Sequence, residues 1–241
     1  MFALSRSILI AALASPLPAT ASGSGSADNA GNVVMVELFT SQGCASCPPA
    51  DEHLAELARR DDVLALSLHV DYWDYLGWQD TLADPGHRIR QSEYRDRLGS
   101  RVLFTPQMII NGSQSLPGAR HDLIENAIEA EAHMPSEAAI HLDQEEGMLH
   151  VEITRIKEAT PCMIWVATFD REATVEIKRG ENAGHVFTYR NVVGKLMKLG
   201  PWNGRDQARL PLPQPGQGEG IAVWLQEEDS GRIVAASFIE N

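Results

Sequence analysis

Two cysteines three positions apart, Cys44 and Cys47, are the residues of this chain best placed to do chemistry. They follow an apolar, β-branched run, residues 33–39, whose lack of alternation predicts a parallel strand covered on both faces. Two prolines and then apolar residues at helical spacing over residues 50–58 predict a helix that begins directly after them. The N–H groups and dipole of a helix N-terminus stabilise a thiolate, the form that exchanges disulfides. We therefore expect Cys44 to attack a partner disulfide and Cys47 to resolve the mixed disulfide.

Other uses of the cysteine pair remain open at this point. The pair could form a fixed structural disulfide, or it could supply two ligands of a metal site. Zinc would need a second pair of ligands at similar spacing, and the sequence has no such pair. The third cysteine, Cys162, is far away in the sequence, and we expect it to be a buried free thiol. If copper were bound, Cys44, Cys47 and His69 would be its ligands. His69 could instead transfer protons together with Asp71, although a histidine at a strand end is more often packed or hydrogen-bonded.

An acidic residue, Glu37, interrupts the apolar run in mid-strand. A buried carboxyl group is costly unless it is protonated or paired with a cation. A raised pKa would suit a proton relay to Cys47, whereas a place at a sheet edge or in a salt bridge would make the residue structural. We expect Glu37 to be the third catalytic residue, and the structural alternative stays open.

A cluster of aromatic residues follows the second predicted strand, residues 62–70, at the sheet edge that also carries the cysteine loop. These residues could form the wall or lid of a groove beside Cys44, or they could cover the sheet with their polar atoms at the rim. In the first case Tyr72, Trp73 and Trp78 would bind substrate.

The run from Val102 to Gly112 contains a proline between two apolar half-strands. Proline removes a hydrogen bond from the strand ladder, and a cis bond between Thr105 and Pro106 at the strand entry would explain its presence. A plain kinked strand is the alternative. Asn111 and Gly112 then predict a hairpin turn.

The remaining elements of residues 33–134 complete an alternating pattern. Residues 84–98 are helix-like, and their charged side chains, Arg90 and Glu93 among them, predict a solvated outer face. Residues 119–133 form the last predicted helix of this part. The predicted order is therefore β-α-β-α-β-β-α.

The second part of the chain, residues 137–241, changes character after a Pro-Ser boundary. Short strands separated by turns predict a β-sandwich-like domain. Residues 211–220 are rich in proline, glycine and glutamine and predict a loop. The predicted strands cover residues 140–142, 148–153, 163–167, 174–178, 186–193, 221–226 and 232–238.

Composition and the N-terminus restrict the setting in which the chain works. The formal net charge of −13 argues against a nucleic-acid binder, which would carry a basic face. Residues 1–21 predict a signal peptide and residues 22–32 a flexible leader, so the mature chain is expected in the periplasm or outside the cell, where a disulfide persists. No later segment predicts a membrane span. Nothing in the sequence indicates a nucleotide or flavin, and no cofactor is expected.

Four stretches of the chain resemble DUF1223, a family of exported bacterial proteins with a thioredoxin-like fold. They are V-E-L-F-T-S-Q-G-C-A-S-C-P-P-A-D, H-V-D-Y-W-D-Y-L-G-W, T-P-Q-M-I-I-N-G and R-G-E-N-A-G-H-V-F-T-Y-R-N-V-V. The resemblance implies an α/β protein with a thioredoxin-like N-terminal domain, followed by the β-sandwich-like domain. In the thioredoxin superfamily a cis-proline loop lies against the C-x-x-C and binds substrate, which implies this role for Thr105 and Pro106. A buried acid on the equivalent strand implies a proton-relay role for Glu37.

Two functions follow from these residues and from the resemblance. The first is an exported thiol–disulfide oxidoreductase that exchanges disulfides with protein thiols or disulfides. The second is a non-catalytic binding module, binding copper or docking a partner, with the cysteine pair as ligands or as a structural disulfide. The sequence leaves the oligomeric state open.

Overall fold

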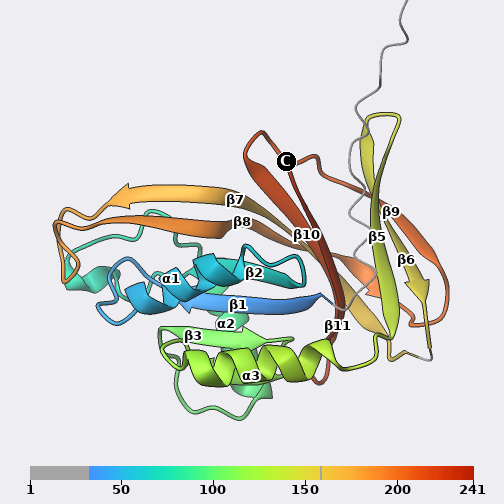
Figure 1. Cartoon of the computed structure of the whole chain (residues 1–241), viewed down its shortest axis with the longest axis horizontal. Helices are drawn as coiled ribbons and strands as arrows, with labels where there is room; N and C mark the ends of the chain where they lie inside the picture. Colours follow the sequence, from blue (N-terminus) through green and yellow to red (C-terminus); the bar gives the residue numbers. More distant parts are fainter. Residues whose placement is uncertain (1–32, 158) are drawn as a thin grey trace, which may run out of the picture.

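The strands of the protein form two sheets, one large and one small (Figure 1). The computed structural model describes residues 33–157 and 159–241, so the predicted signal peptide and leader, residues 1–32, lie outside the described residues. The larger sheet has eight strands in the order β11-β10-β7-β8-β2-β1-β3-β4, and the smaller has three, β5-β6-β9. The protein is therefore of the mixed α/β class, as predicted.

The first part of the chain contains its elements in the predicted order β-α-β-α-β-β-α, with one added 3-10 helix. The elements are β1 (Val34–Thr40), α1 (Pro48–Leu57), β2 (Val63–His69), η1 (Asp74–Leu76), α2 (Pro85–Arg97), β3 (Gln107–Ile110), β4 (Gln114–Pro117) and α3 (His121–Ala132). β1 and β2 are parallel, whereas β3 and β4 are antiparallel to their neighbours. Thr40 lies opposite His69, so β1 and β2 end at one sheet edge, where the cysteine loop and the aromatic segment begin.

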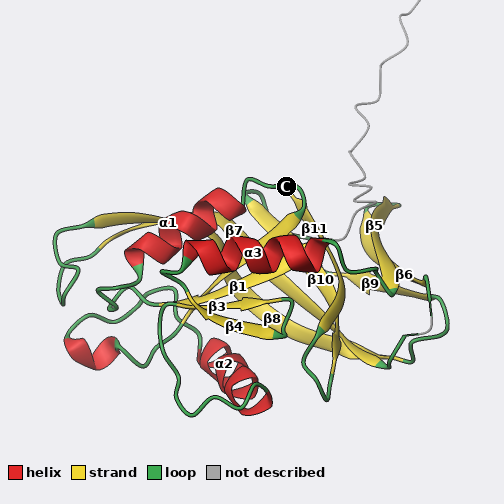
Figure 2. Ribbon diagram, turned by 60° about the horizontal axis from the view of Figure 1, so that its bottom comes forward, coloured by secondary structure: helices red, strands yellow, loops and turns green. Residues whose placement is uncertain are grey.

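Side chains of β1 alternate between two buried faces of the large sheet. Leu38 belongs to the core beneath α1 and α3, whereas Phe39 belongs to the core beneath α2. Figure 2 shows α1 and α3 on one side of the sheet and α2 on the other. By the same alternation Glu37 faces α2, while Thr40 and the paired His69 of β2 face α1.

The second part of the chain is almost entirely strand. Its elements are β5 (Ala138–Glu145), β6 (Met148–Arg155), β7 (Cys162–Glu176), β8 (Val186–Trp202), β9 (Ala208–Leu212), β10 (Glu219–Glu227) and β11 (Ile233–Glu240). The two strands predicted at residues 163–167 and 174–178 are one continuous strand, β7, which forms a long hairpin with β8. The predicted loop at residues 211–220 is shorter than expected, because Pro211 and Leu212 belong to β9, which pairs with β6, and residues 219–220 belong to β10, which pairs with β7.

The large sheet crosses the predicted boundary between the two parts. β8 pairs in parallel with β2, Val192 opposite Ser67, and thereby covers an edge of β2 that would otherwise expose unpaired backbone groups. The small sheet packs on β7, β10 and β11 around a core that includes Val151, Val166 and Val223. The second part thus contains two packed sheets, one of which continues into the first part. The division into residues 33–134 and 137–241 stays a prediction.

No helix in the described ranges is long and apolar enough to cross a membrane.

Candidate functional site

Cys44 and Cys47 form a disulfide at the N-terminus of α1. Cys47 is the N-cap residue, and its carbonyl oxygen accepts hydrogen bonds from the backbone N–H groups of Ala50 and Asp51 at 2.9 and 3.1 Å. The expected position of the cysteine pair at the start of a helix is therefore confirmed. Both cysteines are buried, whereas the two residues between them are exposed. A partner would reach the disulfide over this exposed turn.

The proline loop lies against the first turn of α1. The Thr105–Pro106 bond is cis, as predicted. A Cβ atom added to Gly118 would lie 2.8 Å from the Cβ atoms of both Pro106 and Ala50, so these two residues are close neighbours. The structure therefore brings together the cysteine pair and the proline loop, which are almost 60 residues apart in the sequence.

The aromatic segment connects the cysteine loop to the proline loop. Trp73 donates a hydrogen bond from Nε1 to Oγ1 of Thr105 at 2.7 Å, and its Cβ atom packs against Gly43. Trp78 donates from Nε1 to Oε1 of Gln42 at 2.8 Å. Both tryptophans are half-buried. The segment is therefore beside the cysteine loop, as expected, and it also holds the two loops in place.

The two tyrosines of this segment differ in exposure. Tyr75 is 77% exposed and its ring stacks on that of Trp73. Tyr72 is half-buried, and burial raises the pKa of its hydroxyl. Of these aromatic rings, that of Tyr75 is the most accessible to an arriving partner.

A buried group of polar side chains lies beneath α1, on the same face of the sheet as the cysteines. His69 is fully buried, and its Nδ1 is 2.8 Å from Oδ2 of Asp80. Asp80 also accepts hydrogen bonds from the backbone N–H groups of Gln42 and Leu82. Burial works to raise the pKa of Asp80, but its bonds to His69 and the backbone outweigh this and leave the pKa below the usual value. The predicted partner of His69, Asp71, instead pairs with an arginine.

Asp51, one helical turn after Cys47, completes this buried group. Burial of the carboxyl raises the pKa of Asp51 to about 7, against the opposing influence of His69 and the Thr40 hydroxyl. Three buried atoms of the group have no hydrogen-bond partner among the described residues: Oδ1 of Asp51, Nε2 of His69 and Oγ1 of Thr40. The ring of Tyr189 closes the group, with its centroid 4.6 Å from that of the His69 ring and the two rings nearly perpendicular. The group can therefore take up or give a proton close to neutral pH.

Glu37 is buried, but it belongs to a different cluster on the other face of the sheet. Its carboxylate forms an ion pair with Arg90 and accepts a hydrogen bond from the hydroxyl of Tyr94. Gln226 also bonds to both Arg90 and Tyr94. Arg90 therefore points into the protein, and the prediction that it belongs to a solvated face was wrong. Glu37 needs a buried cation, and the side of α2 that faces the sheet supplies it.

A residue from the second part of the chain also holds the cysteine loop. Asn182 lies in the loop between β7 and β8, and its Nδ2 donates to the carbonyl oxygens of Gln42 at 2.9 Å and Cys44 at 3.1 Å. Figure 1 shows this hairpin tip and the start of α1 at the same end of the molecule. Gly180 in the same loop packs against Trp78.

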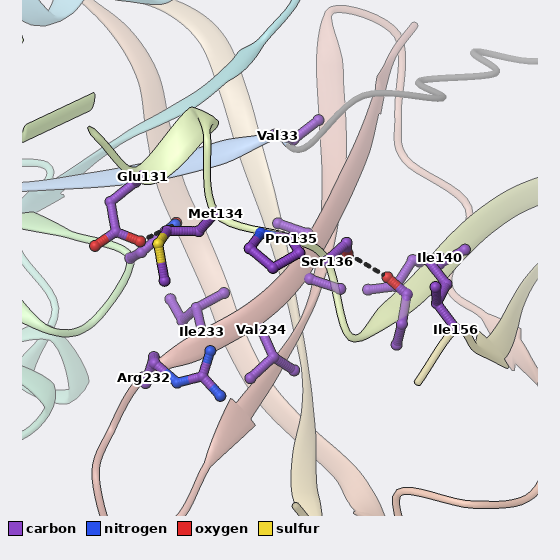
Figure 3. A pocket seen from close by; sticks show the side chains of 15 residues that line it. Val33, Glu131, Met134, Pro135, Ser136, Ile140, Ile156, Arg232, Ile233 and Val234 are labelled. Atoms are coloured by element: carbon purple, nitrogen blue, oxygen red, sulfur yellow. Dashed lines mark hydrogen bonds between the residues drawn. The ribbon is translucent and has the colours of Figure 1, made fainter. Parts of the chain in front are cut away.

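A separate cavity of about 130 Å³ lies between the end of α3, the start of β5 and β11 (Figure 3). Its lining includes Met134, Ile156 and Arg232, and none of the residues predicted as site residues. The third cysteine, Cys162, is buried as expected, and burial raises the pKa of its thiol to about 12. Within the described part of the chain, no group of three or more potential ligands is placed to hold a metal ion.

Comparison with known proteins establishes the family. The sequence matches the family model described as a protein of unknown function, DUF1223, over residues 35–226. The chain belongs to the DUF1223 family. A crystal structure of an Agrobacterium tumefaciens protein, 34% identical, has a TM-score of 0.75 and covers 87% of this chain and 95% of its own. HBP35 of Porphyromonas gingivalis is similar in fold, with a TM-score of 0.63 at 13% identity over 87% of this chain and 75% of its own. The search of curated proteins returned no match.

Three residues at the site of this DUF1223 protein escaped the sequence analysis: Asp51, Asp80 and Asn182. A signal for Asp51 was present, because it lies three positions before Leu54 and so on the inner side of the predicted helix. Asp80 and Asn182 sit in loops without regular spacing. Only the folded chain places their side chains against the cysteine loop.

Proposed function

We propose that this DUF1223 protein is an exported thiol–disulfide oxidoreductase with a thioredoxin-like N-terminal part. The observation that carries the proposal is the position of the Cys44–Cys47 disulfide, at a helix N-terminus and above a buried carboxyl whose pKa is about 7. The parallel β1 and β2 with the proline loop beside α1 support the thioredoxin-like arrangement. Export rests on the predicted signal peptide.

In the proposed reaction the reduced protein attacks a disulfide of a partner protein. The Cys44 thiolate bonds to one partner sulfur, and the other partner sulfur leaves as a thiolate that takes up a proton. Cys47 then loses its proton and attacks Cys44, which re-forms the Cys44–Cys47 disulfide and releases the second partner thiol. The two electrons move from the protein to the partner, and the same steps in reverse oxidise a partner dithiol.

Asp51 is the proposed acceptor of the Cys47 proton. It lies one turn along α1 from Cys47, and a pKa of about 7 leaves a large ionised fraction at neutral pH. The hydrogen-bonded His69–Asp80 pair lies in the same buried group. The geometry supports Asp51 in this role in preference to Glu37, since Glu37 is on the far side of the sheet and bonded to Arg90.

The substrate-binding residues are proposed as Thr105, Pro106 and the half-buried aromatic residues Tyr72, Trp73 and Trp78. Trp73 spans from the cysteine loop to Thr105, so these residues border the exposed turn above the disulfide. A protein segment carrying the target cysteine would lie along this border.

The test is a redox titration of the mature protein against glutathione, with thiols counted by mass. We expect a reversible couple within roughly −120 to −270 mV, the range of thiol–disulfide catalysts. A reduction potential below about −300 mV would mean that the disulfide is structural. That result would overturn the enzymatic proposal in favour of a binding module.

A pair of variants tests the roles of the two cysteines. Cys47→Ser should accumulate a mixed disulfide with a model disulfide substrate, because the resolving thiol is missing, whereas Cys44→Ser should form none. Equal trapping by both variants would contradict the assignment of Cys44 as the attacking thiol.

A further inference from the structure

The cysteine loop is held by two parts of the chain that are far apart in sequence. The loop residue Gln42 receives most of its contacts from the first part: its N–H donates to Asp80, and its side chain bonds to Trp78 and Thr81. Its carbonyl oxygen, and that of Cys44, are bonded instead by Asn182, from 140 and 138 residues away. These two carbonyl groups frame the segment that leads into the disulfide.

The amide of Asn182 is well suited to this position. Its side chain is buried, and one NH2 group provides two N–H donors, so a single residue satisfies both carbonyl oxygens. The loop around it has close backbone contacts, because Gly180 packs on Trp78, which in turn bonds Gln42. The hairpin tip is thereby fixed to the cysteine loop at more than one point.

We propose that Asn182 is a positioning residue that sets the redox equilibrium of the Cys44–Cys47 pair, so that the β7–β8 hairpin is a working part of the redox site. The donor end of its amide dipole points at the backbone of Cys44. A positive dipole end stabilises negative charge nearby, and on reduction the sulfur of Cys44 becomes a thiol in equilibrium with its thiolate. Asn182 therefore favours the reduced form. The inference rests on the proposed function in so far as this equilibrium serves exchange with partners.

The equilibrium can be written for glutathione as reductant. Two glutathione molecules give up two electrons and two protons and join as glutathione disulfide, while the Cys44–Cys47 bond breaks and each cysteine gains a hydrogen. Loss of the Asn182 donors should move this equilibrium toward the protein disulfide.

The experiment compares wild type with Asn182→Ala and Asn182→Asp. Removing the two hydrogen bonds should lower the equilibrium constant for reduction about three-fold in N182A, the effect of a neutral hydrogen-bond loss. In N182D, which sets a carboxylate against two carbonyl oxygens, the decrease should reach about ten-fold, equivalent to about 30 mV. The alkylation rate of reduced Cys44 at pH 7 should fall in the same order.

A matched control is present in the same strand pair. Asn191 is also buried, and its Nδ2 donates to the carbonyl oxygen of Ala65, at 3.0 Å and far from the cysteines. Its φ is +48°, so Asn191→Gly removes the amide without straining the backbone. N191G should lower Tm and leave the redox equilibrium unchanged within two-fold.

The outcomes separate this inference from the proposed function. A wild-type pair that responds only to dithiothreitol would overturn the enzymatic proposal, and the same three-way comparison made in dithiothreitol would still decide the role of Asn182. A wild-type pair in balance with glutathione, together with N182A and N182D values equal to it, would overturn the inference alone. Equal shifts in N182A and N191G would also overturn it, because they would reflect lost stability alone.

Discussion

The central strand β1 separates two buried ionisable clusters that are arranged in opposite ways. On the α2 face, Glu37 is neutralised by Arg90, and Tyr94 and Gln226 bond to the remaining polar atoms. On the α1 face, Asp51 lies near His69 and Asp80 with no cation of comparable strength, and several polar atoms have no partner within the described chain. Charge balance and complete hydrogen bonding fix a core, whereas an unbalanced cluster retains protons that can move.

The aromatic surroundings strengthen the same contrast. The guanidinium group of Arg90 lies about 5 Å from the rings of Tyr94, Trp165 and Trp224. Desolvation opposes the charge on Arg90, but Glu37 outweighs it, and the pKa of Arg90 is raised above its usual value. Arg90 is thus charged at any physiological pH. We regard the Glu37–Arg90 cluster as structural, and we assign the proposed proton transfer to the Asp51 cluster.

The largest effect on stability should come from breaking the balanced cluster. Arg90→Met would leave Glu37 buried without its cation, and should lower the free energy of unfolding by about 3–5 kcal/mol in urea denaturation. The exposed ion pair of Arg209 with Asp143 is the control, since R209M should cost less than about 1 kcal/mol. If R90M cost no more than R209M, the Glu37 cluster would not be the structural one. The double variant E37Q/R90M should regain part of the loss.

The unbalanced Asp51 cluster should make the stability of the protein depend on pH. The pKa of Asp51 is about 7 in the folded chain and near its ordinary value of 3.8 in the unfolded chain, so the folded chain holds an extra proton between these values. The contribution of Asp51 to the free energy of unfolding therefore falls as pH rises through this window and levels off above it. Asn at this position does not titrate. D51N should match wild type near pH 3.5 and exceed its stability by roughly 2–4 kcal/mol at pH 8.

The measurement for this prediction is urea denaturation at several pH values from 3.5 to 8. Glu52→Gln is the control, since Glu52 is the exposed neighbour of Asp51 and its replacement should leave the pH profile unchanged. A D51N profile parallel to that of wild type would mean that Asp51 is ionised in the folded chain, and the contrast between the clusters would fail.

The smallest effects should come from deleting one hydroxyl in each cluster. Tyr94→Phe removes a group that bonds to Glu37, Arg90 and Gln226, and should cost about 1–2 kcal/mol. Thr40→Val removes a hydroxyl with no hydrogen-bond partner in the described structure, so its cost should stay within about 0.5 kcal/mol. Equal losses of stability in Y94F and T40V would contradict the difference in hydrogen bonding between the two clusters.

The sequence predicted those features whose signals are local. The cysteine pair at a helix start, the cis bond at Pro106 and the turn at Asn111 and Gly112 each follow from a few adjacent residues, and the structure confirms all three. The order of the elements in residues 33–134 was also predictable, because each strand and helix there carries a local signal: an uninterrupted apolar run for the buried strands, and apolar spacing or helix start and stop residues for the helices.

Features that depend on distant partners were not predictable in the same way. Arg90 belongs to a charged stretch of α2, and its inward direction is set by Glu37, which lies 53 residues earlier. The pairing of β8 with β2 joins residues 67 and 192, and no hydrophobic pattern within β8 predicts this partner. A charged side chain on a helix is stable on the solvent face, and also on the buried face if an opposite charge lies in the core beside it. Local patterning therefore cannot tell which face the side chain takes.

The contact of Asn182 with Cys44 has a consequence for the time at which the site is completed. A chain that emerges from its N-terminus exposes Cys44 and Cys47 well before residue 182, which is 138 positions beyond Cys44. Closing so long a segment is an entropically expensive step, and contacts of this kind form late. On the proposed export, oxidants outside the cytoplasm would meet, during this interval, a cysteine pair that lacks its contact with Asn182. If Asn182 tunes the cysteine pair as proposed, the newly made chain carries the same two sulfur atoms as the folded protein but with different reactivity, until the β7–β8 hairpin docks.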